Sequence, residues 1–367
     1  MYTNQNKDIN HKFFMDLALR QASRNVGNTK DNPSVGCVIT KNNNLISVGS
    51  TSFNGRPHAE VNAINFADVD LYNSTLYSTL EPCSHYGKSP PCTKLISKSK
   101  IKRVIYSVDD PDKRSHRKCL EYFNKRGILV KKGILSNKIK RFYTSYFKQK
   151  KNILPFITCK IAMSKDHYTI NRNNKWITNS YSRARVHLLR ARHDCILSSS
   201  STVIKDNPSL DCRINGLEKF SPTRIILDNK LNIPINAKIF NCTSQNRTII
   251  FFNKDNKKKI NLLKRKGIKF YKTALDDKKD LDIIKVLIKI KELGFSKVFL
   301  ECGATLTKSF IKDNLIDEFK LFVSNHVLKK NGRGSLKTTL SNFLSKKKKI
   351  IEKVNLNSDK FFTYIIK

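Results

Sequence analysis

Apolar positions in the first 150 residues follow helical spacing in some stretches and strand spacing in others. Residues 11–24 carry apolar side chains three and four positions apart, which predicts an amphipathic helix that ends before Asn32-Pro33. The β-rich run 35–40, a turn at 42–44 and a second run at 45–48 predict a hairpin. The same criteria predict helices over residues 58–67, 92–99 and 114–125, and strands over residues 75–78, 103–108 and 128–130. Strand–helix alternation of this kind is typical of a layered α/β domain.

A second series of elements begins near Pro155. It comprises strands over residues 155–160, 224–227, 248–252, 297–301 and 319–323, helices over residues 180–192, 280–293 and 306–313, and a closing strand over residues 361–366. The Lys- and Gln-rich segment 147–152 is the best linker candidate. We therefore predict two α/β domains, residues 1–148 and 153–367, without an internal repeat.

Composition agrees with two globular domains. The chain has 367 residues, 39% of them hydrophobic, which is enough for two separate cores. No apolar run is long enough to span a bilayer, and residues 1–5 lack the apolar core of a signal peptide. Nine cysteines, an odd number spread over a long chain, do not suggest a disulfide framework. We expect a cytoplasmic protein whose thiols are free to bind metal.

The formal net charge of +42 has two interpretations. One is a nucleic-acid-binding surface. The other is a lysine-rich composition spread over the whole surface, which we favour because the charge is diffuse and few aromatic residues interleave with it. The clusters 257–259 and 346–349 lie far along the chain from the candidate site described next. A basic surface would also suit a small phosphorylated substrate.

Four residues of the first domain have the character of a water-activating zinc site. Zinc prefers nitrogen and sulfur ligands, and a catalytic site keeps three protein ligands and one open position. His58, Cys83 and Cys92 can supply the three ligands. Zinc lowers the pKa of a bound water to about 7, and Glu60, in the same helical turn as His58, can move its proton to a leaving amine.

The order of these residues is more specific than any one of them. A His-x-Glu triplet occurs by chance, and an isolated Cys is usually a small buried apolar residue. Together, His-Ala-Glu before a helix, a strand, Pro-Cys and a second Cys match zinc nucleobase and nucleoside deaminases. Nucleic-acid deaminases usually have two residues between the cysteines, whereas eight separate Cys83 from Cys92 here.

This long loop resembles the deaminase half of the bifunctional enzymes of riboflavin biosynthesis, the RibD/RibG family. The resemblance rests on the stretches Glu81-Pro82-Cys83-Ser84-His85-Tyr86-Gly87-Lys88-Ser89-Pro90-Pro91-Cys92, Asn32-Pro33-Ser34-Val35-Gly36-Cys37 and Asp109-Asp110-Pro111. It implies a cytidine-deaminase-like α/β/α domain in which Asn32, His85, Lys88 and Asp110 line the substrate pocket. An amide suits a pyrimidine edge, and Lys88 with His85 suits a phosphate, although both could equally lie in a solvated loop.

From Pro155 onward the chain resembles the reductase half of the same family. The matching stretches are Lys160-Ile161-Ala162-Met163-Ser164-Lys165-Asp166, Trp176-Ile177-Thr178, Leu188-Leu189-Arg190, Thr202-Val203-Ile204-Lys205-Asp206-Asn207-Pro208-Ser209-Leu210 and Glu301-Cys302-Gly303-Ala304-Thr305-Leu306. With the first half, the resemblance covers nearly the whole chain in order. It implies a dihydrofolate-reductase-like α/β fold and NADPH as the source of hydride.

The resemblance also implies roles for individual residues of the second domain. At the cofactor it places Ala162, Trp176, Thr202, Asp206, Gly303, Ala304, Thr305 and Leu306, and at the substrate Asn174, Arg190, Leu210, Arg213 and Glu301. The segment from Gly303 would open a helix, a suitable seat for a pyrophosphate. Asp206 is the candidate for proton transfer. Trp176, the only tryptophan, could instead pack in a core, and Arg190 and Arg213 could be surface charges.

The chain departs from the family pattern at several positions. The family's His seven residues before His58 is Thr51, and Asp112-Lys113, Arg117 and Cys119 replace an Asn-Pro pair and following glycines. In the second domain the family's Asp-Gly is Asp166-His167, the loop before Trp176 is about two residues shorter with Asn173-Asn174-Lys175, and Asn207 replaces an Asp. These changes concern substrate binding more than zinc chemistry.

The function predicted from the sequence is therefore bifunctional. A zinc-dependent deamination of a phosphorylated ribosylaminopyrimidine is followed by NADPH-dependent reduction of its ribosyl chain to a ribityl chain. The expected partner is this small molecule, with no nucleic acid and no membrane, and with homo-oligomers left open. Two alternatives are a zinc deaminase acting on a nucleic-acid base and a non-enzymatic remnant.

Overall fold

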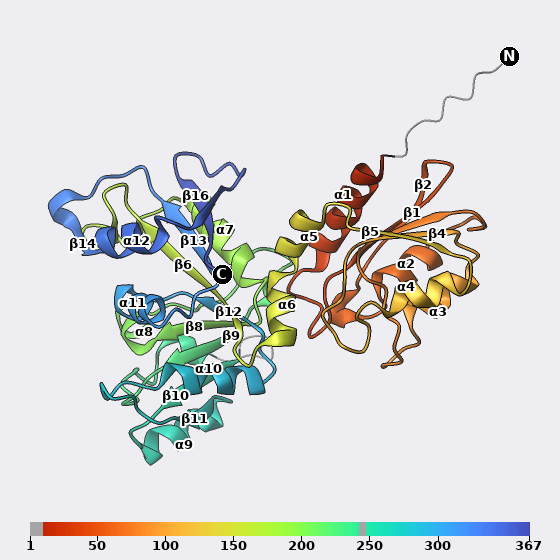
Figure 1. Ribbon diagram of the computed structural model, residues 1–367. Helices are drawn as coiled ribbons and strands as arrows, with labels where there is room; N and C mark the ends of the chain where they lie inside the picture. The colour runs from red at the N-terminus through yellow and green to blue at the C-terminus, as the bar shows by residue number, and fades with distance from the viewer. Residues whose placement is uncertain (1–9, 242–246) are drawn as a thin grey trace. The chain divides into compact units, whose positions relative to one another are not determined.

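The computed structural model describes residues 10–241 and 247–367. The chain divides into two compact units, Met1–Asn152 and Ile153–Lys367 (Figure 1). Each unit has its own main sheet and its own buried hydrophobic residues, which form one cluster in the first unit and two in the second. The expectation about a signal peptide in residues 1–5 lies outside the described residues.

The first unit is built on a five-stranded sheet in the order β2-β1-β3-β4-β5. β1 pairs antiparallel with β2 and with β3, whereas β3, β4 and β5 run parallel. Parallel neighbours need crossover connections, and helices supply them here. The strands are β1 (Gly36–Lys41), β2 (Asn44–Ser50), β3 (Thr75–Leu80), β4 (Arg103–Val108) and β5 (Leu129–Lys132).

Two glycines bring helices against opposite faces of this sheet. A Cβ atom at Gly36 would lie 1.8 Å from the carbonyl oxygen of Ala18 in α1, and one at Gly49 would lie 2.1 Å from that of Ala59 in α2. Because Gly36 pairs with Ser50, next to Gly49, the two glycines point to opposite faces. The helices are α1 (His11–Ala22), α2 (Ala59–Asn65), α3 (Cys92–Lys98), α4 (Lys118–Asn124), α5 (Ser136–Phe142) and α6 (Thr144–Lys151).

The second unit contains a nine-stranded sheet in the order β11-β10-β9-β8-β12-β6-β13-β16-β15. All neighbours are parallel except β16, which is antiparallel to both β13 and β15. β7 (Tyr168–Asn171) and β14 (Gly332–Ser335) form a separate antiparallel ribbon. The strands of the large sheet are β6 (Phe156–Met163), β8 (Cys195–Ser199), β9 (Thr223–Leu227), β10 (Thr248–Phe252), β11 (Lys269–Lys272), β12 (Lys297–Leu300), β13 (Glu318–Val323), β15 (Lys348–Ile351) and β16 (Lys360–Ile365).

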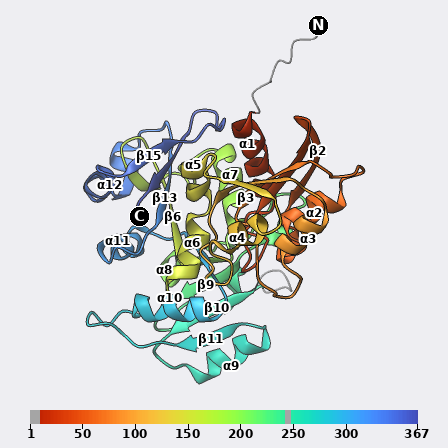
Figure 2. The ribbon, with the colours of Figure 1, turned by 45° about the vertical axis from the view of Figure 1, so that its right-hand side comes forward.

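Helices cover both faces of the large sheet. One core cluster contains residues of α10, α11 and α12, and the other contains residues of α7, α8 and α9. Figure 2 shows β10 and β11 between α10 and α9. The helices are α7 (Ser180–Arg190), α8 (Ser200–Asp206), α9 (Lys257–Arg265), α10 (Ile283–Glu292), α11 (Ala304–Lys312) and α12 (Lys337–Leu344). Among the described residues, no helix combines the length and apolar character needed to cross a membrane.

Most predicted elements are present, but the predicted linker is wrong. The structure places residues 147–151 in α6, whose Tyr146 is buried and follows the buried Tyr143. These aromatic side chains fix the segment on the first core, although lysines dominate its sequence. The predicted helix over residues 114–125 is also shorter, because turns occupy its first positions and α4 starts at Lys118.

Candidate active sites

Three potential metal ligands converge in the first unit. Single ligand atoms of His58, Cys83 and Cys92 all lie within 4.8 Å of one another. The Nδ1 atom of His58 is 3.6 Å from the sulfur of Cys83 and 3.3 Å from that of Cys92. His58 directly precedes α2, and Cys92 is the first residue of α3. One nitrogen and two sulfur donors fit zinc, because they are its preferred ligands and leave a fourth position open.

The electrostatics of this cluster favour a metal-binding thiolate. Hydrogen bonding with Cys92 lowers the pKa of the Cys83 thiol to about 4, and His58 contributes in the same direction. The backbone N–H of Cys92 also donates to the sulfur of Cys83 at 3.3 Å. Glu60 is 4% exposed, and burial raises the pKa of its carboxyl group. A raised pKa makes the carboxylate a better proton acceptor, which suits a group that must take up a proton and then pass it on.

Two of the three ligands and the predicted substrate residues line one cavity of about 450 Å³. Its lining includes His58, Glu60 and Cys83 together with all four residues predicted to bind the pyrimidine, Asn32, His85, Lys88 and Asp110. His85 is half-buried and its Nδ1 lies 2.8 Å from the hydroxyl of Ser115, whereas Lys88 is exposed. The structure therefore brings the whole predicted deaminase set together.

Asp110 sits at the cavity wall in an unusual environment. Burial raises the pKa of its carboxyl group to about 6. Its Oδ1 accepts hydrogen bonds from the hydroxyl of Tyr146 at 3.0 Å and from the backbone N–H of Asp112 at 2.9 Å. The backbone N–H of Asp110 in turn donates to the buried carboxylate of Glu81 at 3.1 Å. Asp110 is thus held in one position from three sides.

In the second unit, a charge network holds Glu301 and Arg190. Arg190 is 9% exposed and donates to both carboxylate oxygens of Glu301, at 3.0 and 3.1 Å, and Lys160 donates to one of them at 3.1 Å. Burial by itself raises the pKa of Glu301, but Arg190 and Lys160 outweigh it and hold that pKa far below its usual range. Arg190 is therefore not a surface charge, and Glu301 stays ionised at neutral pH.

The start of α11 provides a site that fits a phosphate group. Gly303 precedes the helix, and no side chain among the described residues caps its N-terminus. A Cβ atom at Gly303 would find only the hydroxyl of Thr202 within 4 Å, at 3.9 Å, so the space beside Gly303, just before Ala304, Thr305 and Leu306, is open. Exposed N–H groups and the helix dipole favour an anion there. Gly303 and Thr202, both predicted to contact the cofactor, are neighbours.

The other predicted reductase residues lie in several places. Arg213 is exposed, donates to the hydroxyl of Ser209 at 2.6 Å and lies 3.3 Å from the ring of His187. Leu210 is buried with a left-handed φ of 51°, and Ala162 is half-buried in β6. Asp206 ends α8 and is exposed to solvent.

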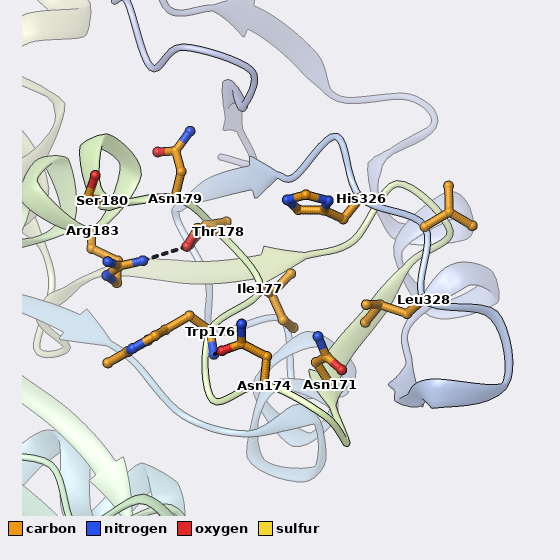
Figure 3. A pocket seen from close by; sticks show the side chains of 11 residues that line it. Asn171, Asn174, Trp176, Ile177, Thr178, Asn179, Ser180, Arg183, His326 and Leu328 are labelled. Carbon is orange, nitrogen blue, oxygen red and sulfur yellow. Dashed lines mark hydrogen bonds between the residues drawn. The ribbon is translucent and has the colours of Figure 1, made fainter.

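A second cavity, of about 560 Å³, lies beside Trp176 (Figure 3). Its lining includes Asn174 and Trp176 but none of the other predicted reductase residues. Trp176 is 50% exposed, which rules out the alternative that it packs in a core. The side chain of Asn174 accepts a hydrogen bond from the backbone N–H of Trp176 at 3.0 Å, and the guanidinium of Arg183 lies 4.9 Å from the Trp176 ring. The structure thus places Asn174 and Trp176 together at this pocket, and the neighbouring Lys175 donates to the backbone carbonyl of Asp206 at 3.4 Å.

Comparisons with known proteins match both units. The RibD C-terminal domain family matches residues 155–352, and the zinc-binding region of cytidine and deoxycytidylate deaminases matches residues 8–108. The riboflavin biosynthesis protein RibD of Aquifex aeolicus is 35% identical over 86% of this chain and 87% of its own length. That of Bacillus amyloliquefaciens is 36% identical over 85% of this chain and 83% of its own.

The chain belongs to the RibD family. A solved Thermotoga maritima structure, described as a diaminohydroxyphosphoribosylaminopyrimidine deaminase/5-amino-6-(5-phosphoribosylamino)uracil reductase, is 28% identical and superimposes with a TM-score of 0.80 over 97% of this chain and 98% of that one. The predicted fold class is confirmed: a cytidine-deaminase-like domain precedes a dihydrofolate-reductase-like domain. This RibD-family chain is an enzyme of riboflavin biosynthesis with a zinc-dependent deaminase and an NADPH-dependent reductase, and it acts on a small molecule.

Thr51 stands where the RibD family has a histidine, and it forms hydrogen bonds with the backbone of Val35. It is 1% exposed, and its hydroxyl accepts a hydrogen bond from the backbone N–H of Val35 at 2.9 Å. The backbone N–H of Thr51 donates to the carbonyl of Val35, also at 2.9 Å. Thr51 therefore ties the end of β2 to the backbone of Val35 beside the cavity through two hydrogen bonds. It brings no positive charge to the position of the family's histidine.

Two other departures from the RibD family pattern lie at left-handed positions of the backbone. Arg117 and His167 stand where the family has glycine, and their φ angles are 58° and 70°. Glycine adopts such left-handed angles without steric cost, whereas other residues do so at an energetic penalty. The carboxylate of Glu81 accepts from the backbone N–H groups of Arg117 at 2.9 Å and of Cys119 at 3.2 Å, which holds this loop in place.

Sequence reasoning missed Glu81, Tyr146 and Lys160 as supports of the two sites. Glu81 directly precedes Pro82-Cys83, and Lys160 lies in the first strand of the reductase unit, so both positions were marked by recognised motifs. Tyr146 carried no such signal, because its neighbours suggested a linker.

Proposed function

We propose that this chain deaminates 2,5-diamino-6-ribosylamino-pyrimidinone 5′-phosphate and then reduces the ribosyl chain of the product to a ribityl chain. The single observation that carries the proposal is the cavity in which His58, Glu60 and Cys83 meet the four predicted pyrimidine-binding residues. The names of the RibD relatives and of the Thermotoga maritima enzyme support the same reactions. We assign deamination to residues 1–148 and reduction to residues 153–367.

Deamination exchanges an amino group for an oxygen from water. A zinc ion held by His58, Cys83 and Cys92 would supply a water molecule acidified enough to attack at neutral pH. Glu60 accepts the proton of the attacking water and returns it to the leaving amino group, which departs as ammonia. Its burial beside Cys92, whose sulfur lies 3.6 Å from the Glu60 Oε2, keeps the carboxyl close to the reacting atoms.

The remaining cavity residues orient the substrate. The side-chain amide of Asn32 can donate to and accept from a pyrimidine edge, and the carboxyl of Asp110 is held rigidly enough to select one edge. His85 and Lys88 bind the phosphate group from the loop between the two cysteines. Positioning of this kind lowers the barrier because the reacting atoms are held together before the reaction.

Reduction uses the residues of the second unit. NADPH would supply the hydride, with its pyrophosphate at the open N-terminus of α11 near Thr202. Arg190, locked by Glu301, presents a fixed guanidinium to the phosphorylated substrate, and Asp206 handles the proton. Ala162, Trp176, Gly303, Ala304, Thr305 and Leu306 complete the proposed cofactor site, and Asn174, Leu210 and Arg213 the proposed substrate site.

We further infer a cytoplasmic enzyme that binds no nucleic acid and leaves homo-oligomerisation open. Every cysteine among residues 10–241 and 247–367 is free, which agrees with a reducing compartment. The positive charge is spread along the whole chain, and few aromatic residues interleave with it, so a small-molecule substrate is favoured over a nucleic-acid base.

The substitution Glu60→Gln tests the assignment of the deaminase. It keeps the size of the side chain but removes proton transfer, so ammonia release should fall by at least about 100-fold. Zinc content should stay at one ion per chain, and oxidation of NADPH with the already deaminated pyrimidine should be unchanged. Ammonia release, bound zinc and NADPH absorbance are measured on the same purified protein.

Glu121→Gln is the matched control, because Glu121 is a carboxylate of the same unit whose side chain is 74% exposed on α4. This variant should behave as the wild type in all three assays. Undiminished ammonia release by the Glu60→Gln protein would contradict the role assigned to Glu60, and wild-type protein with neither activity would contradict the proposed function.

A further inference from the structure

The cationic side chains around the first cavity differ in how their charge is compensated. Arg114 and Lys150 both pair with Asp112, at 2.7 and 3.0 Å. Arg56 and Lys88 also line the cavity, but neither has a carboxylate partner among the residues that the structure describes. Lys30, an exposed residue at the same cavity, likewise has no carboxylate partner among the described residues, so Arg56 and Lys88 are two of three positive charges there that an anion could use.

Arg56 lies along the loop that joins the two cysteine ligands. It is half-buried, and its Nη1 donates a hydrogen bond to the hydroxyl of Ser89. Its Nη2 lies 3.4 Å from the point that a Cβ atom of Gly87 would occupy, and the Nε2 of His85 lies 3.9 Å from the same point. The absent side chain of Gly87 thus leaves a small hollow between a guanidinium and an imidazole.

One nitrogen of the His85 ring, Nδ1, already has a hydrogen-bond partner. His85 Nδ1 contacts the hydroxyl of Ser115 at 2.8 Å, which turns Nε2 towards the hollow. The neighbouring residue Lys88 lines the same cavity. A hollow bordered by a guanidinium, an imidazole and an ammonium group suits a tetrahedral dianion, because charge-assisted hydrogen bonds from Arg are strong and directional.

We propose that Arg56 is a specificity-determining residue of the deaminase, which binds the 5′-phosphate of the substrate over Gly87 and selects phosphorylated over unphosphorylated pyrimidines. This inference rests on the proposed function, since it names the residue with which the same site recognises the phosphate of its substrate. The bond to Ser89 uses one donor of the guanidinium and fixes its direction. The remaining donors stay available for phosphate oxygens, a geometry that a lysine cannot reproduce.

Binding of ribose 5-phosphate tests the subsite without catalysis. Isothermal titration is carried out on the full chain, zinc-loaded and metal-free, as wild type, Arg56→Gln, Ser89→Ala and Arg141→Gln. The Arg56→Gln variant should bind ribose 5-phosphate about 10- to 100-fold more weakly, the range expected for one charge-assisted hydrogen bond. Arg141, on α5 and absent from the cavity lining, is the matched control and should show no change.

Two variants separate phosphate binding from support of the loop. Ser89→Ala removes the anchor but keeps the charge, so its effect should stay below about 3-fold. Gly87→Ala fills the hollow and should weaken ribose 5-phosphate binding while leaving the affinity for zinc unchanged. If Ser89→Ala costs as much as Arg56→Gln, or if Arg56→Gln binds as the wild type does, the proposal is overturned.

Deaminase kinetics then test specificity. In Arg56→Gln, KM for the phosphorylated aminopyrimidine should rise about 10- to 100-fold with kcat within about 3-fold, and Arg56→Lys should restore part of the loss. KM for the dephosphorylated substrate should not change, and an equal rise for both substrates would overturn the proposal. Wild-type protein that binds ribose 5-phosphate through Arg56 but deaminates neither pyrimidine would disprove the proposed function and leave the anion subsite standing.

Discussion

Asp110 shows how a single buried side chain couples the deaminase cavity to pH. Burial raises the pKa of its carboxyl group to about 6, from an ordinary value of about 3.9. Its contribution to stability is therefore fully present below about pH 4 and is lost as the pH rises through about 6. The neighbouring Asp109 has the opposite tendency: although burial opposes it, hydrogen bonds from Tyr106 and Lys132 lower the pKa of Asp109.

Substituting these two aspartates should give opposite pH dependences. Asp110→Asn keeps an oxygen for Tyr146 and for the backbone N–H of Asp112 but cannot ionise. Relative to the wild type, it should gain about 2 kcal/mol of unfolding free energy between pH 4.5 and pH 7.5. Asp109→Asn should instead lose stability relative to the wild type as the pH rises towards about 4, and the difference should then stay nearly constant between pH 4.5 and pH 7.5. Calorimetric unfolding without substrate measures both, and parallel pH profiles for the two variants would contradict the assignment.

Among single residues, the sequence identified candidate metal ligands and substrate-binding residues, but it did not identify the residues that hold them in place. His58, Cys83, Glu60 and the four predicted substrate-binding residues line one cavity, and Cys92 lies beside His58 and Cys83. Glu81 and Tyr146 were missed because their function depends on burial and on contacts with residues 29 to 36 positions away, which spacing alone does not reveal.

The position of α2 on the sheet controls the metal site. His58 directly precedes this helix, and Glu60 lies in its first turn. Gly49 permits the close approach: a Cβ atom there would lie 2.1 Å from the carbonyl oxygen of Ala59 and 2.6 Å from the backbone nitrogen of Ala63. Gly49→Ala should push α2 away from β2 and weaken zinc binding by at least about 10-fold, the range expected when ligand supports move. Competition with a chelator measures the affinity.

Gly36→Ala is the matched control for this prediction. Its Cβ atom would clash equally, 1.8 Å from the carbonyl oxygen of Ala18, but on the opposite face, where α1 carries no ligand. Both variants should lose about 1–3 kcal/mol of stability through overpacking, but only Gly49→Ala should lose zinc affinity. Fluorescence of Trp176, the single tryptophan, verifies that the second unit remains folded in each. Equal zinc affinities in the two variants would refute the argument.

Helices and strands were predicted correctly where the sequence shows one clear pattern, either a run of apolar residues or helical spacing. Buried strands such as β4 and β10 are runs of apolar residues, and α1 and α10 have clear helical spacing. It failed for α6, whose lysine-rich sequence surrounds the buried Tyr146, and for β8 and α8, whose serine-rich boundary has no strong periodicity. In these places tertiary packing, rather than local preference, decides the structure.

For the whole molecule, the order of motifs was more informative than composition. A net charge of +42 suggested nucleic acid, whereas two successive sets of motifs indicated two reactions on one small molecule. The match of both units to RibD proteins over 85% or more of the chain agrees with the motifs. Charge describes the surface as a whole, whereas each reaction depends on a few side chains of one unit, and the order of motifs predicted which ones.

If each unit holds a complete active site, two differently inactivated chains should complement one another. Glu60→Gln lacks deamination, and Glu301→Gln lacks reduction, because Arg190 and Lys160 lose the negative charge that holds them. Neither variant alone should form the ribityl product, but their mixture should, after a lag that shortens as protein concentration rises. The lag arises because the deaminated intermediate must diffuse from one chain to the other.

The ribityl product is followed by chromatography, with the double variant as the negative control. A mixture that releases ammonia but never forms ribityl product would show that the intermediate does not pass between chains, and would contradict two independent sites.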